Sequence, residues 1–175
     1  MRFSCYIILI TYCGISWRCT GTKEINPDDL GSRYFPLKTG EYRIYQVEGT
    51  KYISSTDSME FSYFLKESVA DTFDNLAAGT SYKIIREKRS EVENTWKIDS
   101  LWTARKDERT AIMVENNIPK VVLVFPVADN KSWDGNSQNG KNADEFDMID
   151  IGLPFHGKYD QFAETTTVIQ EMLPD

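Results

Sequence analysis

Alternating hydrophobic and polar side chains predict β-strands in the first half of the chain. In residues 42–47, successive side chains fall on opposite sides of an extended segment. Residues 59–73 fit two patterns, because the spacing of Phe61, Leu65 and Val69 also suits one face of a helix. The aromatic content of this stretch favours a strand.

Four further β-type runs follow one another after a loop that contains Gly79. They cover residues 81–90, 95–105, 110–116 and 120–127. The segments between them have only three or four residues, which is the length that joins antiparallel neighbours. The sequence therefore predicts a continuous antiparallel meander.

Two local patterns refine this prediction. Trp96, Ile98 and Trp102 share a parity, so regular alternation would place them on one apolar face. Residues 121–125 (VVLVF) are apolar at every position, which is typical of a central strand covered on both sides.

The last third of the chain contains a long polar tract. Residues 129–145 are rich in Asn, Asp and Gly, and they predict mostly loop. Residues 145–152 suit a short strand, and residues 165–173 suit a closing strand. The predicted fold class is all-β and mainly antiparallel: a curved meander that forms a sandwich or a partly open barrel.

The N-terminal pattern differs from the rest. Arg2 precedes an apolar run of about 13 residues, and the chain then becomes polar around Cys19. The run is shorter than the roughly 20 residues of a membrane-spanning helix, so it resembles the core of a secretory signal. We therefore expect a signal peptide over residues 1–18, a tether over 19–33 and a single domain over 34–175.

Cys19 is the candidate lipidation site, since cleavage before it would leave a cysteine at the new N-terminus. Acyl chains on that residue would anchor the domain to a membrane. Trp17 and Arg18 precede it where small residues are expected, so ordinary secretion and an uncleaved start remain alternatives. A further alternative is that the apolar run is a buried first strand or helix of the domain.

Composition limits the partners and the stabilising devices of the exported part. The cysteines are Cys5, Cys13 and Cys19, so no disulfide can form within the expected domain. Removing Arg2 and Arg18 from the 20 cations leaves 18 cations against 27 acidic residues, a net charge of −9. Such a surface disfavours nucleic acid and anionic lipid, so we expect no nucleic-acid partner.

The chain offers little for catalysis, and we expect neither an enzyme nor a cofactor. His156 is the only histidine, and no elbow-type serine motif accompanies it. One histidine without interior cysteines cannot supply a usual zinc site. No phosphate-binding G-x-x-x-x-G-K motif is present. A pair of carboxylates on neighbouring strands, as in glycosidases, would not be visible in the sequence.

Calcium is the better metal hypothesis, although a solvated loop explains the same residues. Asp134, Asn136 and Glu145 fall at spacings that a 12-residue calcium loop would use. Gln138 stands where a third ligand is usual, and Gly140 comes one position late. Trp133, at the start of this tract, is a candidate for contact with a ligand or partner.

Three motifs carry a resemblance to a known group of proteins: YFPLKTGEYRIYQV, NTWKIDSLWTARKDERTAIMVENN and LVFPVADNKSWDGN. Through them, residues 34–171 resemble uncharacterised cell-surface or periplasmic lipoproteins of Bacteroidota. The resemblance implies an envelope location and an antiparallel β fold, and it implies no activity. The chain departs from the group in its degenerate lipobox and in ending at Leu173–Asp175, where relatives continue with further strands.

These observations together predict a non-catalytic envelope protein with a structural or interaction role. We expect it in the periplasm or at the outer membrane of a Gram-negative bacterium, held to the membrane by its N-terminus, with another envelope protein as a second candidate partner. A carrier that holds a small ligand or lipid in a curved sheet is the alternative, and an envelope hydrolase is a remote one.

Overall fold

The computed structural model describes residues 28, 30–75, 79–90, 92 and 95–170. This part of the chain is all-β apart from one turn of 3₁₀ helix, η1 (Ser32–Tyr34). The strands are β1 (Tyr42–Tyr52), β2 (Ser58–Asn75), β3 (Gly79–Arg89), β4 (Lys97–Lys106), β5 (Thr110–Glu115), β6 (Ile118–Val124), β7 (Lys131–Asp134), β8 (Glu145–His156) and β9 (Gln161–Gln170). The predicted all-β antiparallel class is confirmed.

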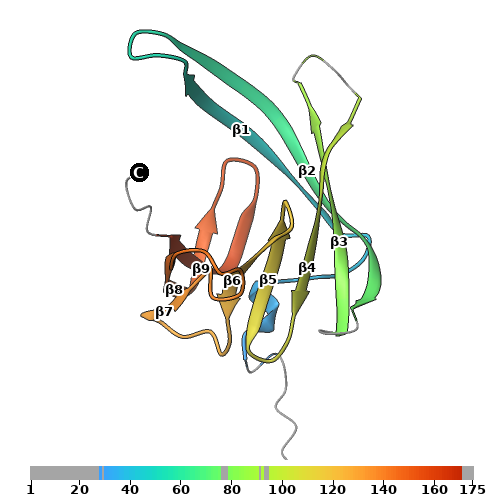
Figure 1. The fold of residues 1–175 in the computed structure, drawn as a ribbon, viewed down its shortest axis with the longest axis vertical. Helices are drawn as coiled ribbons and strands as arrows, with labels where there is room; N and C mark the ends of the chain where they lie inside the picture. The colour runs from blue at the N-terminus through green and yellow to red at the C-terminus, as the bar shows by residue number, and fades with distance from the viewer. Residues whose placement is uncertain (1–27, 29, 76–78, 91, 93–94, 171–175) are drawn as a thin grey trace, which may run out of the picture.

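The first six strands form one antiparallel meander in the order β1-β2-β3-β4-β5-β6. The sheet curls strongly, and the β1–β2 hairpin projects beyond its neighbours (Figure 1). Directly paired residues point to the same face, so the register defines two faces. We call the face that carries the buried side chains of Leu65, Val69, Ile84 and Ala104 the inner face, and the opposite one the outer face.

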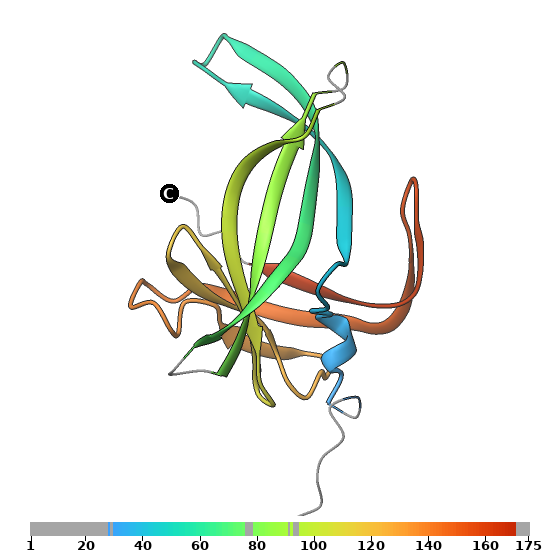
Figure 2. The same cartoon turned by 90° about the vertical axis from the view of Figure 1, so that its right-hand side faces the viewer.

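Strands β7, β8 and β9 form a second antiparallel sheet, and its long β8–β9 hairpin curves upward at its tip (Figure 2). The two sheets meet at Val121 in β6. Its N–H donates to the Gly135 carbonyl at 2.9 Å, and its carbonyl accepts from Trp133 Nε1 at 2.8 Å.

The segment from Leu30 to Leu37 fills the space inside the curl. Two clusters of buried residues lie around it, one of Ala111, Leu123, Phe125 and Met148, the other of Val69, Ile84 and Ala104. Phe35 packs against both clusters. Within the described residues, Leu30 already packs against the first cluster, so residues ahead of Tyr34 contribute to the core.

The predicted shared face of Trp96, Ile98 and Trp102 is wrong, because a β-bulge interrupts β4. Arg86 pairs with Ser100, but Glu87 pairs with Ile98, so one extra residue reverses the alternation. Trp102 therefore packs on the inner face against the core, whereas Ile98 is 75% exposed on the outer face.

The prediction that residues 121–125 form a central strand is also corrected. β6 is the last strand of its sheet, yet Val121, Leu123 and Phe125 are buried. The apolar run lies where the two sheets meet. The second sheet covers β6, which would otherwise be an exposed edge strand. The tract 129–145 is a loop except for the short β7, and β8 is longer than expected.

Candidate functional site

A row of alternating charges crosses the inner face at the register of Arg43, Glu67 and Arg86. Arg43 pairs with Glu67 across β1 and β2, and Glu67 pairs with Arg86 across β2 and β3. Arg86 Nε lies 2.9 Å from Glu67 Oε1 in an ion pair whose geometry is not that of a hydrogen bond. The Arg86 guanidinium also stacks 3.7 Å above the ring of Trp102. We call these three residues the arginine–glutamate row.

A cavity of about 250 Å³ lies beside this row, and we call it the inner cavity. Its buried end is apolar, formed by Val69 and Ile84 together with the partly buried Phe35, Leu37 and Met113. Arg43, Tyr45 and Glu67 line its more exposed end. A second, partly open cavity of about 370 Å³ shares Pro36, Arg43, Glu67 and Val69 with it, so the two adjoin.

The pKa of Tyr45 is shifted by its position at the exposed end of the inner cavity. Burial is the main cause that raises the pKa of its phenol above 10, and the nearby Glu67 carboxylate raises it further. Arg43 acts in the opposite direction. The cavity is therefore partly desolvated at the position of the Tyr45 ring, which strengthens any charge interaction made there.

Lys106 holds the segment that covers the inner cavity. Its Nζ donates to the carbonyl oxygens of Ser32 at 3.0 Å and Phe35 at 2.9 Å. Burial lowers the pKa of this amine below 10.5, while Asp28 has the opposite effect. A second tie is the exposed ion pair between Arg33 and Glu164 at 3.0 Å, which joins η1 to β9.

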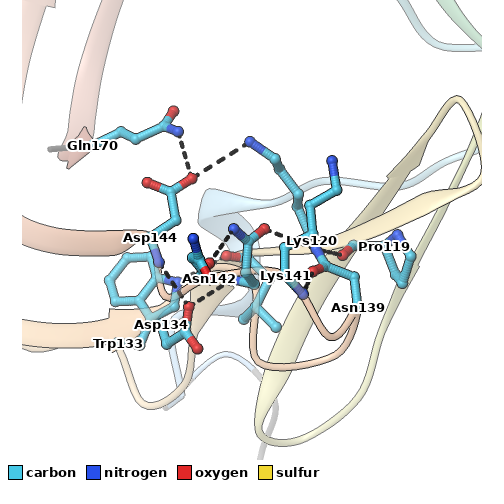
Figure 3. A network of polar contacts seen from close by, with 11 residues as sticks. Pro119, Lys120, Trp133, Asp134, Asn139, Lys141, Asn142, Asp144 and Gln170 are labelled. Atoms are coloured by element: carbon cyan, nitrogen blue, oxygen red, sulfur yellow. Dashed lines mark hydrogen bonds and ion pairs between the residues drawn. The ribbon is translucent and has the colours of Figure 1, made fainter. Parts of the chain in front are cut away.

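The loop after β7 brings two of the three calcium candidates, Asp134 and Asn136, into a hydrogen-bonded network that Figure 3 shows around Asp134. Asp134 Oδ1 accepts from the backbone N–H groups of Asn136 at 2.8 Å and Asp144 at 3.0 Å. Asn136 donates through Nδ2 to the Asn142 carbonyl at 2.8 Å. Glu145 begins β8 with an exposed side chain. The carboxylate of Asp134 is thus used to shape the loop, as in an Asx turn.

Asp144 connects this loop to both sheets. Its Oδ2 accepts from Gln170 Nε2 of β9 at 2.7 Å and lies 3.5 Å from Lys120 Nζ of β6 (Figure 3). In the described residues, no group of three or more His, Cys, Asp and Glu side chains is placed to hold a metal ion. In these contacts the carboxylates of Asp134 and Asp144 hold the loop in shape and attach it to β6 and β9.

The other residues singled out in the sequence fall in separate places. Trp133 packs against the core and stacks on Phe146 at 5.7 Å, so its ring is occupied by structural contacts. Trp96 lies on the outer face near Lys66 and Arg89, at 5.8 and 4.8 Å from its ring. His156 is exposed at the end of β8, opposite Gln161. Cys19 lies outside the described residues.

Large apolar side chains are exposed on two hairpins that approach each other. Gln46 Oε1 of β1 accepts from the Tyr159 hydroxyl at the β8–β9 tip at 2.7 Å. A surface groove of about 520 Å³ lies here, bordered among others by Ile44, Tyr45 and Phe155. The described residues contain no helix that is long and apolar enough to span a membrane.

Groups with a clearly shifted pKa do not converge on one cleft in the described part. Besides Tyr45 and Lys106 they are Arg33, Asp71 and Asp99. The pKa of Asp99 is lowered chiefly by its bond with Lys88, and that of Asp71 by the backbone N–H of Thr72. Of the five, Tyr45 alone borders the cavities described above.

Sequence reasoning missed the arginine–glutamate row and the inner cavity. The charges of Arg43, Glu67 and Arg86 lie on three strands, and only the register brings them together. The alternation of 42–47 placed Arg43 and Tyr45 on one face, which was the one signal available. No protein-family model, no curated protein and no solved structure matches the chain.

Proposed function

We propose that this protein is a non-catalytic binding module of a bacterial cell envelope, exported by residues 1–18 and tethered through lipidated Cys19. The sequence supports the tether, because Cys19 follows an apolar run that is too short to span a membrane. The acidic composition supports a soluble body that reaches the membrane through its N-terminus rather than through surface charge.

The observation that carries the binding role is the number of large apolar side chains exposed on two hairpins. Monomeric proteins rarely expose contiguous apolar surface beyond a few hundred Å², and larger patches mark interaction sites. On β1–β2 the exposed residues are Tyr42, Ile44, Tyr45, Tyr52, Ile53, Met59 and Phe61, and on β8–β9 they are Leu153, Phe155, Tyr159, Phe162 and Ile169. These side chains point to both faces of β1–β2, and the groove bordered by Ile44, Phe155 and Tyr159 is where the two hairpins meet, so we infer that another envelope protein covers this groove.

The alternative, a carrier for a small ligand or lipid in the curved sheet, is limited by the geometry to a small ligand. Such a carrier needs an enclosed apolar cavity, but Leu30–Leu37 and two packed clusters fill the inside of the curl. The cavities that do exist are small or open. The hydrolase alternative lacks a converging set of groups with shifted pKa values in the described residues, which catalysis usually requires.

Metabolic labelling with a fatty-acid analogue tests the tether. We expect the wild type to be labelled and Cys19→Ser to be unlabelled, since that cysteine would carry the acyl chains. Cys13→Ser is the matched control and should be labelled like the wild type. Equal labelling of the wild type and Cys19→Ser would rule out the tether.

Site-specific photocrosslinking in intact cells tests the interaction surface. A photoreactive phenylalanine at Phe155, which is 57% exposed, should give a discrete adduct with one envelope protein. The same group at Asn117, in the exposed β5–β6 turn, is the control and should give none. Adducts of the same pattern from both positions, or from neither, would contradict an interaction role for the β8–β9 hairpin.

A further inference from the structure

The inner cavity combines an apolar end with a charged end. Val69 and Ile84, at its buried end, are only 7% and 5% exposed, and they offer hydrocarbon surface. Arg43 and Tyr45 are exposed where the cavity reaches solvent. A ligand that fills both ends must therefore be amphipathic.

The charged side chains that line the exposed end of the inner cavity are one cation, Arg43, and one acid, Glu67. The chain carries a net charge of −7, but the arginine–glutamate row holds two cations and one acid. The two acids near the cavities are each matched by another cation, since Glu67 pairs with Arg86, and Glu41 lies 3.3 Å from Lys38. No ion pair joins Arg43 to a described residue, but its side chain bonds the Tyr45 hydroxyl, which leaves further guanidinium N–H donors for an anion.

We propose that the inner cavity binds a single-chain amphiphile with an anionic head group. The chain lies against Val69, Ile84 and Met113, and the head group accepts hydrogen bonds from the Arg43 guanidinium. The cavity volume of about 250 Å³ is below the roughly 300–1,000 Å³ of most small-molecule sites, which favours one short chain over a two-chain lipid. Of the residues that line the inner cavity, Tyr45 alone also belongs to the proposed interaction surface.

Segment Leu30–Leu37 gives the cavity its shape. Phe35 and Leu37 line it from the side opposite the sheet, and Lys106 fixes the Phe35 carbonyl. The ligand therefore enters a site that is already formed, so binding carries little ordering cost.

Calorimetric titration of the full chain with three eight-carbon probes tests this site: octanoate, 1-octanol and octylammonium. Octanoate is kept below the concentration at which it forms micelles. We expect octanoate to bind at least tenfold more tightly than octylammonium, because Arg43 attracts the carboxylate. The net negative charge of the protein would give the opposite preference, so this order cannot come from general attraction.

Arg43→Gln should weaken octanoate binding at least tenfold and change 1-octanol binding less than twofold, because the apolar end is untouched. Arg105→Gln is the matched control, since Arg105 bonds Gln138 away from the cavity, and it should bind octanoate like the wild type. Absence of octanoate binding, equal binding by Arg43→Gln, or an equal loss in Arg105→Gln would overturn the proposal.

Discussion

At the scale of single residues, two glycines lie against aromatic rings that occupy the space of a side chain. A Cβ on Gly49 would lie 2.6 Å from Phe61 Cζ, and one on Gly135 would lie 2.2 Å from Phe146 Cε2. Phe61 covers a glycine in the edge strand β1, which shields its backbone from water. Phe146 is 6% exposed within the junction of the two sheets, so it has little room to move.

Gly135→Ala should lower the free energy of unfolding by about 1–3 kcal/mol, because the added methyl group overpacks the region around Phe146. Urea denaturation followed by Trp fluorescence measures the change. Ser137→Ala, at an exposed position of the same loop, should stay within about 0.5 kcal/mol of the wild type. A Gly135→Ala variant as stable as its control would show that Phe146 can move aside.

Tyr45 should ionise above the ordinary phenol pKa of 10, because its environment is desolvated and faces Glu67. The folded state then holds this proton more firmly than the unfolded chain does. Stability from this group is present below pH 10 and is lost as the pH rises through the higher folded-state pKa. The phenolate absorbance of the wild type minus that of Tyr45→Phe isolates the midpoint.

Glu67→Gln should lower the midpoint of Tyr45, since it removes the nearby negative charge that contributes to the shift. Glu60→Gln, on the same strand but nearer the hairpin tip, is the comparison and should leave it in place. A Tyr45 midpoint at or below pH 10 in the wild type would contradict the partly desolvated character of the cavity.

At the scale of elements, the alternation of side chains identified the strands because one face of the sheet is buried. The meander of β3 to β6 was predicted in order, since their short connections allow few arrangements, whereas β1 and β2 were predicted as strands without a place in the sheet. The bulge in β4 was not predicted, because one extra residue leaves no local mark beyond Ser100 among apolar neighbours. The candidate site was not predicted either, because pairing across Arg43, Glu67 and Arg86 is a property of register.

Lys106 should stabilise the docked Leu30–Leu37 segment through its two bonds to backbone carbonyls. Lys106→Met should cost about 1–3 kcal/mol, because the Ser32 and Phe35 carbonyls would lose their partner. Lys38→Met is the control, since the Lys38 side chain is 79% exposed and its substitution should be nearly neutral. Urea denaturation at pH 7 compares the three proteins.

The Lys106 contribution should also grow with pH. Burial lowers its folded-state pKa below 10.5, so the unfolded chain binds more protons between that folded value and 10.5. The stability difference between the wild type and Lys106→Met should therefore increase as the pH rises through this window. A difference that is constant, or that shrinks, would contradict a desolvated amine.

At the scale of the whole molecule, stability depends on a small shared core without disulfides. The three cysteines precede residue 20, so none lies within the two sheets. The sheets are joined by Val121, by Asp144 and by the side chains of the Leu30–Leu37 segment. Phe35 packs against both clusters, so its side chain links the core of the first sheet to the core shared with the second.

Phe35→Ala should therefore destabilise both sheets, by about 1–3 kcal/mol, which is below the range of about 3–5 kcal/mol for a fully buried aromatic because Phe35 is only partly buried. Hydrogen exchange resolved by peptide should show faster exchange in β3–β5 and in β8–β9 together, since each cluster loses the same ring. Phe162→Ala, which truncates a side chain that is 49% exposed on β9, is the control and should change exchange only locally. If Phe35→Ala speeds exchange in one sheet and leaves the other unchanged, the two sheets are separate cooperative units, and the segment inside the curl covers one of them without joining both.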